Sequence, residues 1–370
     1  MTSLRIANAN SWRRIRPSLL VFAAIAGSMA TFAVSTECIG RYGEPFMRLS
    51  RPPTGEEASA AIPIEYALRS TEYNDVIFLG DSAPSHAIDP VYFQELTGLK
   101  AYNLASLRPI SINGFLLTAQ AYLSNHPAPR VMVLCVCPEV PGGADVDRVI
   151  AKRFVRVYGR EIRAADPAVD AIVKSVVDAD EYDVLIRRGA AVVRDYLAQL
   201  GSMNRHNFRE DRINGSSTET FNSLERKLRA SRGQYKVRGL HGRPNAPEYV
   251  GVRWSITPEW DRAVRALIRL ADAHRVLLLI RLAPARTDAA AEIFDEISAG
   301  FRHLQSEFPQ ILVNPEVVFY EEGLCLDLWH LNSVGATRFT QLLAKDVRLA
   351  IDDRMRKAQR IPKATNSRPN

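Results

Sequence analysis

Short apolar runs alternate with segments of helical spacing in two parts of the chain, 74–139 and 250–351. Four of the runs are rich in β-branched residues and leucine, as in strands buried on both faces, and they predict strands at 76–79, 131–137, 275–281 and 311–313. A second short strand is predicted at 101–104. Apolar residues at helical spacing predict helices at 90–97, 112–124, 260–274, 288–308 and 333–351. This alternation predicts an α/β domain with a parallel sheet covered by helices.

The alternation is interrupted between the two parts. Apolar residues recur at helical spacing over 178–200, but 201–247 is rich in Arg, Asn, Gly and Ser and has little periodicity. We therefore expect 140–249 to be an insertion, either a helical cap or a partly mobile lid. Beyond the last predicted helix, the basic residues within 352–370 predict a solvated tail.

The amino-terminal region predicts a membrane anchor. Arginines at 1–17 precede an uncharged, mostly apolar stretch at 18–36, which is long enough to cross a bilayer as a helix. The arginines flank it on one side only, so residues 1–17 are expected in the cytoplasm and the rest beyond the membrane. A cleaved signal peptide is the alternative, because small residues at 28–30 could form a cleavage site. Residues 37–73 then predict a polar, proline-containing stem.

Composition narrows the function only a little. The chain has 370 residues, of which 46% are hydrophobic and 24% are charged, and this is enough for an ample core. Its net charge of +7 comes from scattered basic residues, without zinc-finger spacing or an aromatic-basic RNA-binding pattern, so nucleic acid is not an expected partner. His86 and His330 lack the companion ligands of a metal site, and no metal or cofactor is expected.

Two separated segments carry candidate chemistry. Gly80-Asp81-Ser82 follows the first predicted strand, where ligands bind in parallel α/β sheets. Far downstream, Asp327 precedes His330 by three residues, just before the last predicted helix. A serine hydroxyl needs a base to take its proton, and an imidazole base needs an acid to fix its tautomer. The alternative for Ser82 is a helix N-cap, and Asp81 is expected to serve the turn.

These segments resemble the first and last blocks of the SGNH or GDSL hydrolase superfamily. The last block extends from Asp327 through His330-Leu-Asn to Gly335, and the resemblance covers about 74–139 and 255–350. It implies a flavodoxin-like parallel sheet with helices on both faces. It also implies that Ser82 is the nucleophile, His330 the general base and Asp327 the orienting carboxylate.

The middle blocks of the superfamily are altered in this chain. Asn103 begins the second block, but Arg108 stands about where a glycine of the oxyanion hole is expected. The Gly-x-Asn-Asp of the third block is absent from 135–139, and this removes the usual asparagine donor. The remaining candidates for oxyanion or substrate binding are Asn103, the N–H groups of Ser82 and Ala105, and the charge of Arg108. A salt bridge at the surface is the alternative role for Arg108.

The membrane anchor and the altered blocks resemble the envelope-side members of this superfamily, which assist D-alanylation of teichoic acids or O-acetylation of alginate. The resemblance implies an esterase or O-acyltransferase of the bacterial periplasmic side, acting on an acylated envelope carbohydrate beside a membrane acyltransferase. A catalytically weak binding or scaffold component is the alternative. Hydrolysis and transfer share one acyl-enzyme, so the residues do not separate them.

The chain has four cysteines, which leave two interpretations open. In an oxidising compartment Cys137 and Cys325 could pair, because both are expected near one edge of the sheet. Buried free thiols are the alternative.

Overall fold

The computed structural model describes residues 55–142, 221–235, 255–289 and 292–360, together with 154, 158, 159, 162, 167 and 169–171. These residues all belong to one compact unit, formed by Pro53–Val177 and Ser217–Asn370. The predicted cytoplasmic segment 1–17 and anchor 18–36 lie outside the described residues. Within the described residues, no helix combines the length and the apolar character that a bilayer crossing requires.

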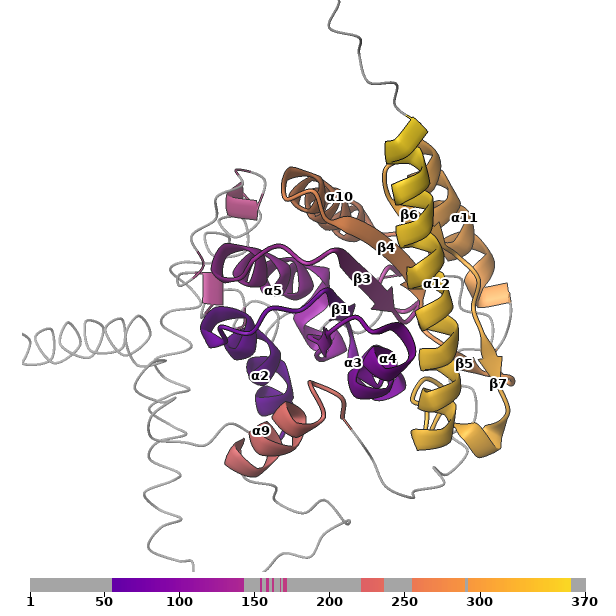
Figure 1. Ribbon diagram of the computed structural model, residues 1–370. Coiled ribbons are helices and arrows are strands. Elements are labelled where there is room, and N and C mark those ends of the chain that lie inside the picture. The colour runs from indigo at the N-terminus through magenta and orange to yellow at the C-terminus, as the bar shows by residue number, and fades with distance from the viewer. Residues whose placement is uncertain are drawn as a thin grey trace, which may run out of the picture. The chain divides into compact units, whose positions relative to one another are not determined.

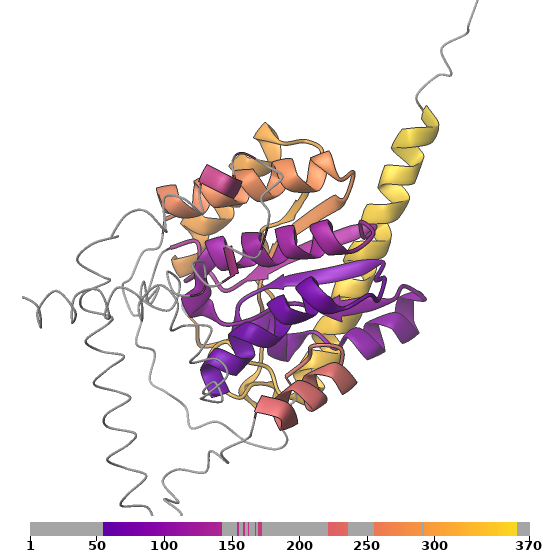
Figure 2. The same cartoon turned by 90° about the vertical axis from the view of Figure 1, so that its left-hand side faces the viewer.

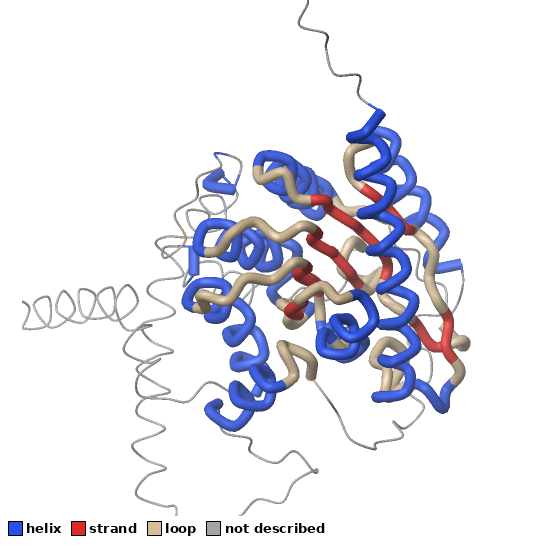
Figure 3. Tube along the Cα trace, in the orientation of Figure 1, coloured by secondary structure: helices blue, strands red, loops and turns tan. Residues whose placement is uncertain are grey.

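A five-stranded parallel sheet forms the centre of the unit (Figure 3). Its strands follow the order β2 (Ala101–Asn103), β1 (Val76–Gly80), β3 (Val131–Val136), β4 (Leu277–Leu282) and β6 (Leu312–Asn314). Every residue of β1, β3 and β4 is buried, as the continuous apolar runs predict for strands covered on both faces. The predicted α/β class and parallel sheet are confirmed.

Helices α5 (Ser111–Asn125) and α10 (Pro258–Ala273) lie side by side against the sheet (Figures 1 and 2). Helix α11 (Glu292–Glu307) packs on β6. It also contacts α10, because the rings of Trp260 and Phe301 stack with their centroids 5.3 Å apart.

Three further helices form a second group around the sheet: α3 (Ser82–Ala87), α4 (Pro90–Thr97) and α12 (Ser333–Arg360). Helix α12 contacts α3, α4 and β4, and Figure 1 shows it in yellow beside α4. The fully buried Arg281 of β4 pairs with Asp346 of α12 at 2.5 Å and lies 4.8 Å from the ring centroid of Phe339. This ion pair links α12 to β4.

The structure differs from the sequence prediction at both ends of the domain. Residues 55–69 of the expected stem form a helix, α2 (Gly55–Arg69), because its alanines, isoleucines and Tyr66 provide enough apolar surface to pack on α5. The tail predicted at 352–370 is wrong for its first part, because α12 continues to Arg360. Within this extension, Arg354 donates to the carbonyl oxygen of Arg275 at 2.8 Å.

A small additional sheet precedes the helix predicted at 288–308. Strands β5 (Ala285–Arg286) and β7 (Phe319–Tyr320) pair in parallel just after the carboxyl end of β4. Residues 287–289 then form a turn and a bend instead of helix, and α11 spans Glu292–Glu307. In the inserted region, α9 (Phe221–Ala230) packs on α2, while most of 140–249 lies outside the described residues.

Candidate active site

The sharp end of β1 positions the first candidate segment. Gly80 has a φ of 146°, and a Cβ atom at this position would lie 1.8 Å from the carbonyl oxygen of Cys135 on β3. Only glycine allows this conformation and this approach of the two strands. The chain therefore turns at the carboxyl edge of the sheet and presents the next two residues there.

Asp81 holds the turn between β1 and α3. Its carboxylate accepts hydrogen bonds from the N–H of Ala83 at 2.8 Å, as the N-cap of α3, and from the N–H of Cys137 at 2.7 Å. Burial raises the pKa of Asp81, although these two N–H groups act against the shift. The N-cap of α3 is thus Asp81 rather than Ser82, and the Ser82 hydroxyl is left for another partner.

The loop before α12 positions the second candidate segment. Oδ1 of Asp327 accepts hydrogen bonds from the N–H groups of Trp329 and His330, each at 2.9 Å. Asn332 caps α12 by accepting from the N–H groups of Val334 and Gly335, each at 3.1 Å. These Asx-type contacts make a compact turn that aims the His330 ring.

The structure brings Ser82, His330 and Asp327 together in one chain of contacts. Nε2 of His330 lies 2.9 Å from Oγ of Ser82, and Nδ1 lies 2.7 Å from Oδ2 of Asp327. A carboxylate beside Nδ1 keeps the proton there, which leaves the Nε2 lone pair to accept the serine O–H. The arrangement can therefore remove a proton from Ser82 and hold it on the imidazole.

The electrostatics of Asp327 suit this arrangement. Burial raises its pKa, but the hydrogen bond and charge of His330 and the two backbone N–H groups outweigh burial and lower the pKa to about 2. The side chains of His330 and Asp327 are 25% and 40% exposed, so solvent reaches the cluster. Asp327 is consequently ionised at neutral pH beside an accessible base.

The expected oxyanion donors are largely engaged elsewhere. The N–H of Ala105 donates to Oδ1 of Asn103 at 3.0 Å. It is therefore not free to donate to an oxyanion, the role proposed for it from the sequence. The Asn103 amide nitrogen donates to the carbonyl oxygen of Pro84 at 2.9 Å. Asn103 is fully buried and joins β2 to α3, which gives it a structural position rather than a substrate-facing one.

Arg108 pairs with Glu139, which the sequence analysis did not single out as a partner. The Arg108 guanidinium contacts Oε2 of Glu139, and the Glu139 residue is fully buried while the Arg108 side chain is 31% exposed. The charge of Arg108 lowers the pKa of Asp81, in opposition to the effect of burial. Arg108 therefore supplies positive charge close to the turn that carries Ser82, and its partner is buried rather than at the surface.

His86 and Tyr235 are neighbours of the cluster that sequence reasoning did not assign to it. The His86 ring centroid lies 4.7 Å from that of His330 and 5.0 Å from that of Tyr235. The spacing of Ser82 and His86 on α3 is the signal for His86, because residues four apart share a helix face. Nothing in the sequence indicates Tyr235, which comes from the inserted region.

The described cysteines do not form the disulfide that the sequence left open between Cys137 and Cys325. Cys135, Cys137 and Cys325 are free and buried. Burial raises the pKa of the Cys135 thiol to about 12 and that of Cys325 to about 11, so these thiols stay protonated at neutral pH. Of the two interpretations, buried free thiols fit the described part of the chain. In the same part, no three His, Cys, Asp or Glu side chains are grouped to hold a metal ion.

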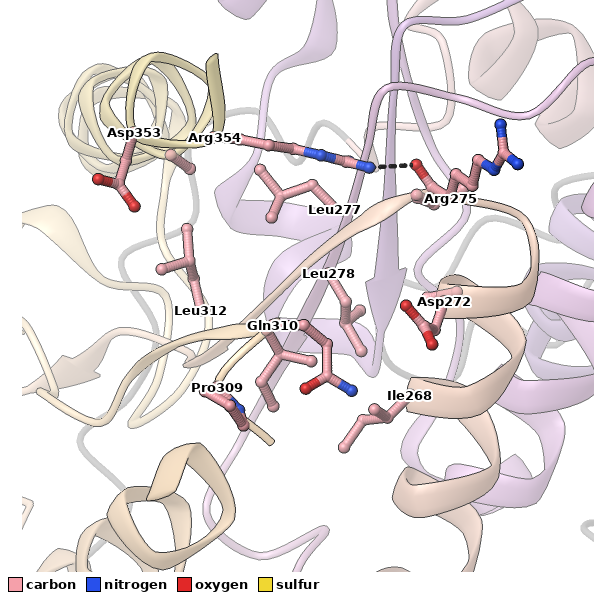
Figure 4. A pocket seen from close by; sticks show the side chains of 14 residues that line it. Ile268, Asp272, Arg275, Leu277, Leu278, Pro309, Gln310, Leu312, Asp353 and Arg354 are labelled. Atoms are coloured by element: carbon pink, nitrogen blue, oxygen red, sulfur yellow. Dashed lines mark hydrogen bonds between the residues drawn. The ribbon is translucent and has the colours of Figure 1, made fainter. Parts of the chain in front are cut away.

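A pocket of about 220 Å³ lies at the amino-terminal ends of β4 and β6, opposite the carboxyl ends where Ser82 lies (Figure 4). It is lined by the amino-terminal residues of β4 and β6, the end of α10 and the later part of α12, including Leu277, Leu312, Asp272 and Arg354. Because parallel strands share one direction, this pocket is separated from the Ser82 edge by the length of the strands.

The distances between Ser82, His330 and Asp327 are therefore the support for this candidate site. Comparisons with known proteins found no protein-family model that matches the chain and no significantly similar curated protein.

Proposed function

We propose that the chain is a serine ester hydrolase or O-acyltransferase that works through an acyl-enzyme on Ser82. The observation that carries this proposal is the continuous line of contacts from Ser82 through His330 to Asp327. The strand order β2-β1-β3-β4-β6 matches flavodoxin-like doubly wound sheets and supports an SGNH-hydrolase-like fold. The carboxyl edge of such a sheet, where the cluster lies, is the usual place for a ligand.

The reaction divides into two steps. Oγ of Ser82 attacks the ester carbonyl while its proton moves to Nε2 of His330, and collapse of the tetrahedral intermediate passes that proton to the leaving alkoxide. In the second step His330 takes a proton from water or from an acceptor hydroxyl, which attacks the acyl group. Collapse of this second tetrahedral intermediate breaks the bond between the acyl carbon and Oγ, and His330 returns the proton to Oγ of Ser82. Water gives hydrolysis and a hydroxyl gives transfer. The backbone N–H of Ser82 is the candidate hydrogen-bond donor to the oxyanion, and the positive charge of Arg108 is the candidate for its electrostatic stabilisation.

The substrate proposal rests on the anchor predicted at 18–36. An anchored catalytic domain on the periplasmic side would remain close to envelope or exported polysaccharides and to a membrane acyltransferase that delivers acyl groups. Tethering raises the effective concentration of such partners without requiring tight binding. Acetyl-like esters of an envelope carbohydrate are therefore the proposed substrates.

Labelling of the full-length chain with a fluorophosphonate probe tests the proposal. The expected result is one adduct on Ser82, no adduct in Ser82→Ala and labelling at least 10²-fold slower in His330→Ala. Ser306→Ala on α11 is the control and should label like the unchanged protein. A folded protein that gains no adduct on Ser82 would rule out the enzymatic proposal.

A scaffold role is the second candidate, and the engaged donors around the cluster favour it. The Ala105 N–H is bonded to Asn103, and Arg108 is paired with Glu139. Loss of one oxyanion donor costs roughly 10²–10³-fold in rate. A protein that labels on Ser82 but turns over no acyl ester, in the presence of either water or carbohydrate acceptors, would fit a binding component of an envelope-modification complex.

A further inference from the structure

His86 lies directly against the proposed catalytic base. It stands one helical turn after Ser82 on α3, and its ring is 4.7 Å from that of His330 with an angle of 58° between the planes. The His330 ring is thus bounded by Ser82, Asp327 and His86, of which only the first two make hydrogen bonds to it. His86 contacts the His330 ring by packing, with the two ring planes tilted against each other.

Tyr235 from the inserted region packs on His86. The two ring centroids are 5.0 Å apart, and the N–H of Tyr235 donates to the carbonyl oxygen of Ser85 at 2.9 Å. Gln234 contacts the carbonyl oxygen of His86 at 3.4 Å. A segment that is distant from α3 in the sequence therefore holds both the backbone and the ring of His86.

The neighbouring residues fix this segment on the sheet. The N–H of Asn103 on β2 donates to the carbonyl oxygen of Arg232 at 2.9 Å. Gly233 has a φ of 92°, and a Cβ there would lie 1.9 Å from the carbonyl oxygen of Asn103. Such a close approach requires glycine, so the path of 231–235 along β2 is set by specific backbone contacts.

The His86 imidazole stays neutral beside the base. Burial, and then the charge of His330, lower the pKa of His86 to about 3, while Asp327 acts in the opposite direction. Its Nδ1 atom is buried and makes no hydrogen bond to any described residue. The ring therefore contributes its shape and neutrality to the cluster, because a second positive charge at this distance would oppose protonation of His330.

We propose that His86 is a positioning residue that holds the His330 imidazole toward Ser82, and that Tyr235 of the inserted region holds His86 in place. The inference rests on the proposed function, and it makes residues 231–235 part of the active site. A displacement of about 1 Å in a reacting group can cost on the order of 10²-fold in rate. Replacing His86 should therefore lower the reactivity of Ser82, although neither Ser82 nor His330 is itself changed.

The test compares ring removal with ring replacement in the full-length chain. We expect His86→Ala to lower the rate of fluorophosphonate labelling by about 10- to 100-fold, and His86→Phe to restore it to within about threefold. His303→Ala on α11, which changes an exposed histidine, is the control. An unchanged rate in His86→Ala, or equal slowing in His86→Phe, would overturn the proposal.

A double-mutant cycle tests the role of Tyr235. If Tyr235 acts through His86, Tyr235→Ala slows labelling in the unchanged protein but has no further effect in His86→Ala. Additive effects would contradict this order of action. If the unchanged protein does not label at all, it is the proposed function that fails, so the two failures are distinguishable.

Urea unfolding separates positioning from a general loss of structure. Under conditions where His86→Ala is fully folded, its labelling rate should still be about 10- to 100-fold low. A labelling rate that follows only the folded fraction would overturn the positioning role.

Discussion

Oγ of Ser82 and Nε2 of His330 lie 2.9 Å apart although 248 positions separate them in the sequence. The parallel sheet explains this meeting, since β1 ends at Gly80, two residues before Ser82, and the loop before α12 returns to the same carboxyl end of the strands. Helix α12 then runs across α3, and their contact holds the two halves of the site together. The reactivity of Ser82 should consequently depend on residues from both halves.

Asp327→Asn should lower the rate of Ser82 labelling by about 10³- to 10⁴-fold. An asparagine amide can donate to Nδ1 of His330, and this would favour the tautomer whose Nε2 carries the proton and cannot accept the serine O–H. Labelling rates at pH 7.5 measure the effect. Asp272→Asn, which changes an exposed residue at the opposite edge of the sheet, should label normally. Equal rates for the two variants would contradict the role of Asp327.

Gly80→Ala should destabilise the domain by about 3–5 kcal/mol, because it adds a steric clash with β3 to an unfavourable φ. Gly98→Ala is the matched control. Gly98 also has a positive φ, of 75°, but a Cβ there has no atom within 4 Å, so the expected loss is about 1–2 kcal/mol. Urea unfolding of both variants measures the difference. Equal losses would show that the close approach to Cys135 is unimportant.

The hydrophobic pattern predicted the centre of the fold well. The runs around Val76, Val131 and Leu277 became strands buried on both faces, for which a continuous apolar sequence is the expected signal. The pattern was less informative at the ends, where α2 packs with alanines and isoleucines that a linker could also contain. Its burial depends on α5, a tertiary partner that local sequence does not specify.

The candidate site could be predicted only for residues with a directional chemical role. Serine, histidine and aspartate in recognisable surroundings indicated the hydrogen-bonded line. Asn103 shows the limit, because a buried amide between β2 and α3 has the same sequence signal as a substrate-binding one. Tyr235 contributes by packing, and packing across a long insertion leaves no local pattern.

Arg108→Gln should lower the labelling rate by about 10²-fold if its charge stabilises the oxyanion. It should also destabilise the protein by about 3 kcal/mol, because the buried Glu139 loses its partner. The double variant Arg108→Gln/Glu139→Gln separates the two effects, since it should recover stability in urea unfolding while labelling stays slow. Recovery of both would assign Arg108 a purely structural role. Arg262→Gln on α10, at an exposed position, is the control.

Acid should destabilise the unchanged protein between pH 7 and pH 5 partly through His86. The folded pKa of His86 is about 3, below its ordinary value of 6.5, so the unfolded chain binds a proton first as the pH falls. This contribution to stability is complete above pH 6.5 and is lost progressively toward pH 3. The lowered pKa of Asp327, about 2, affects stability only below about pH 5.

His86→Phe should therefore lose less stability than the unchanged protein between pH 7 and pH 5, by up to about 2 kcal/mol. Urea unfolding at the two pH values measures this difference, and His303→Phe provides the control because His303 is exposed on α11. The comparison excludes the Asp327 carboxyl, which remains ionised in both states throughout this range. If His86→Phe loses as much stability as His303→Phe, His86 is protonated in the folded protein at pH 5, and a neutral ring cannot be what supports His330 there.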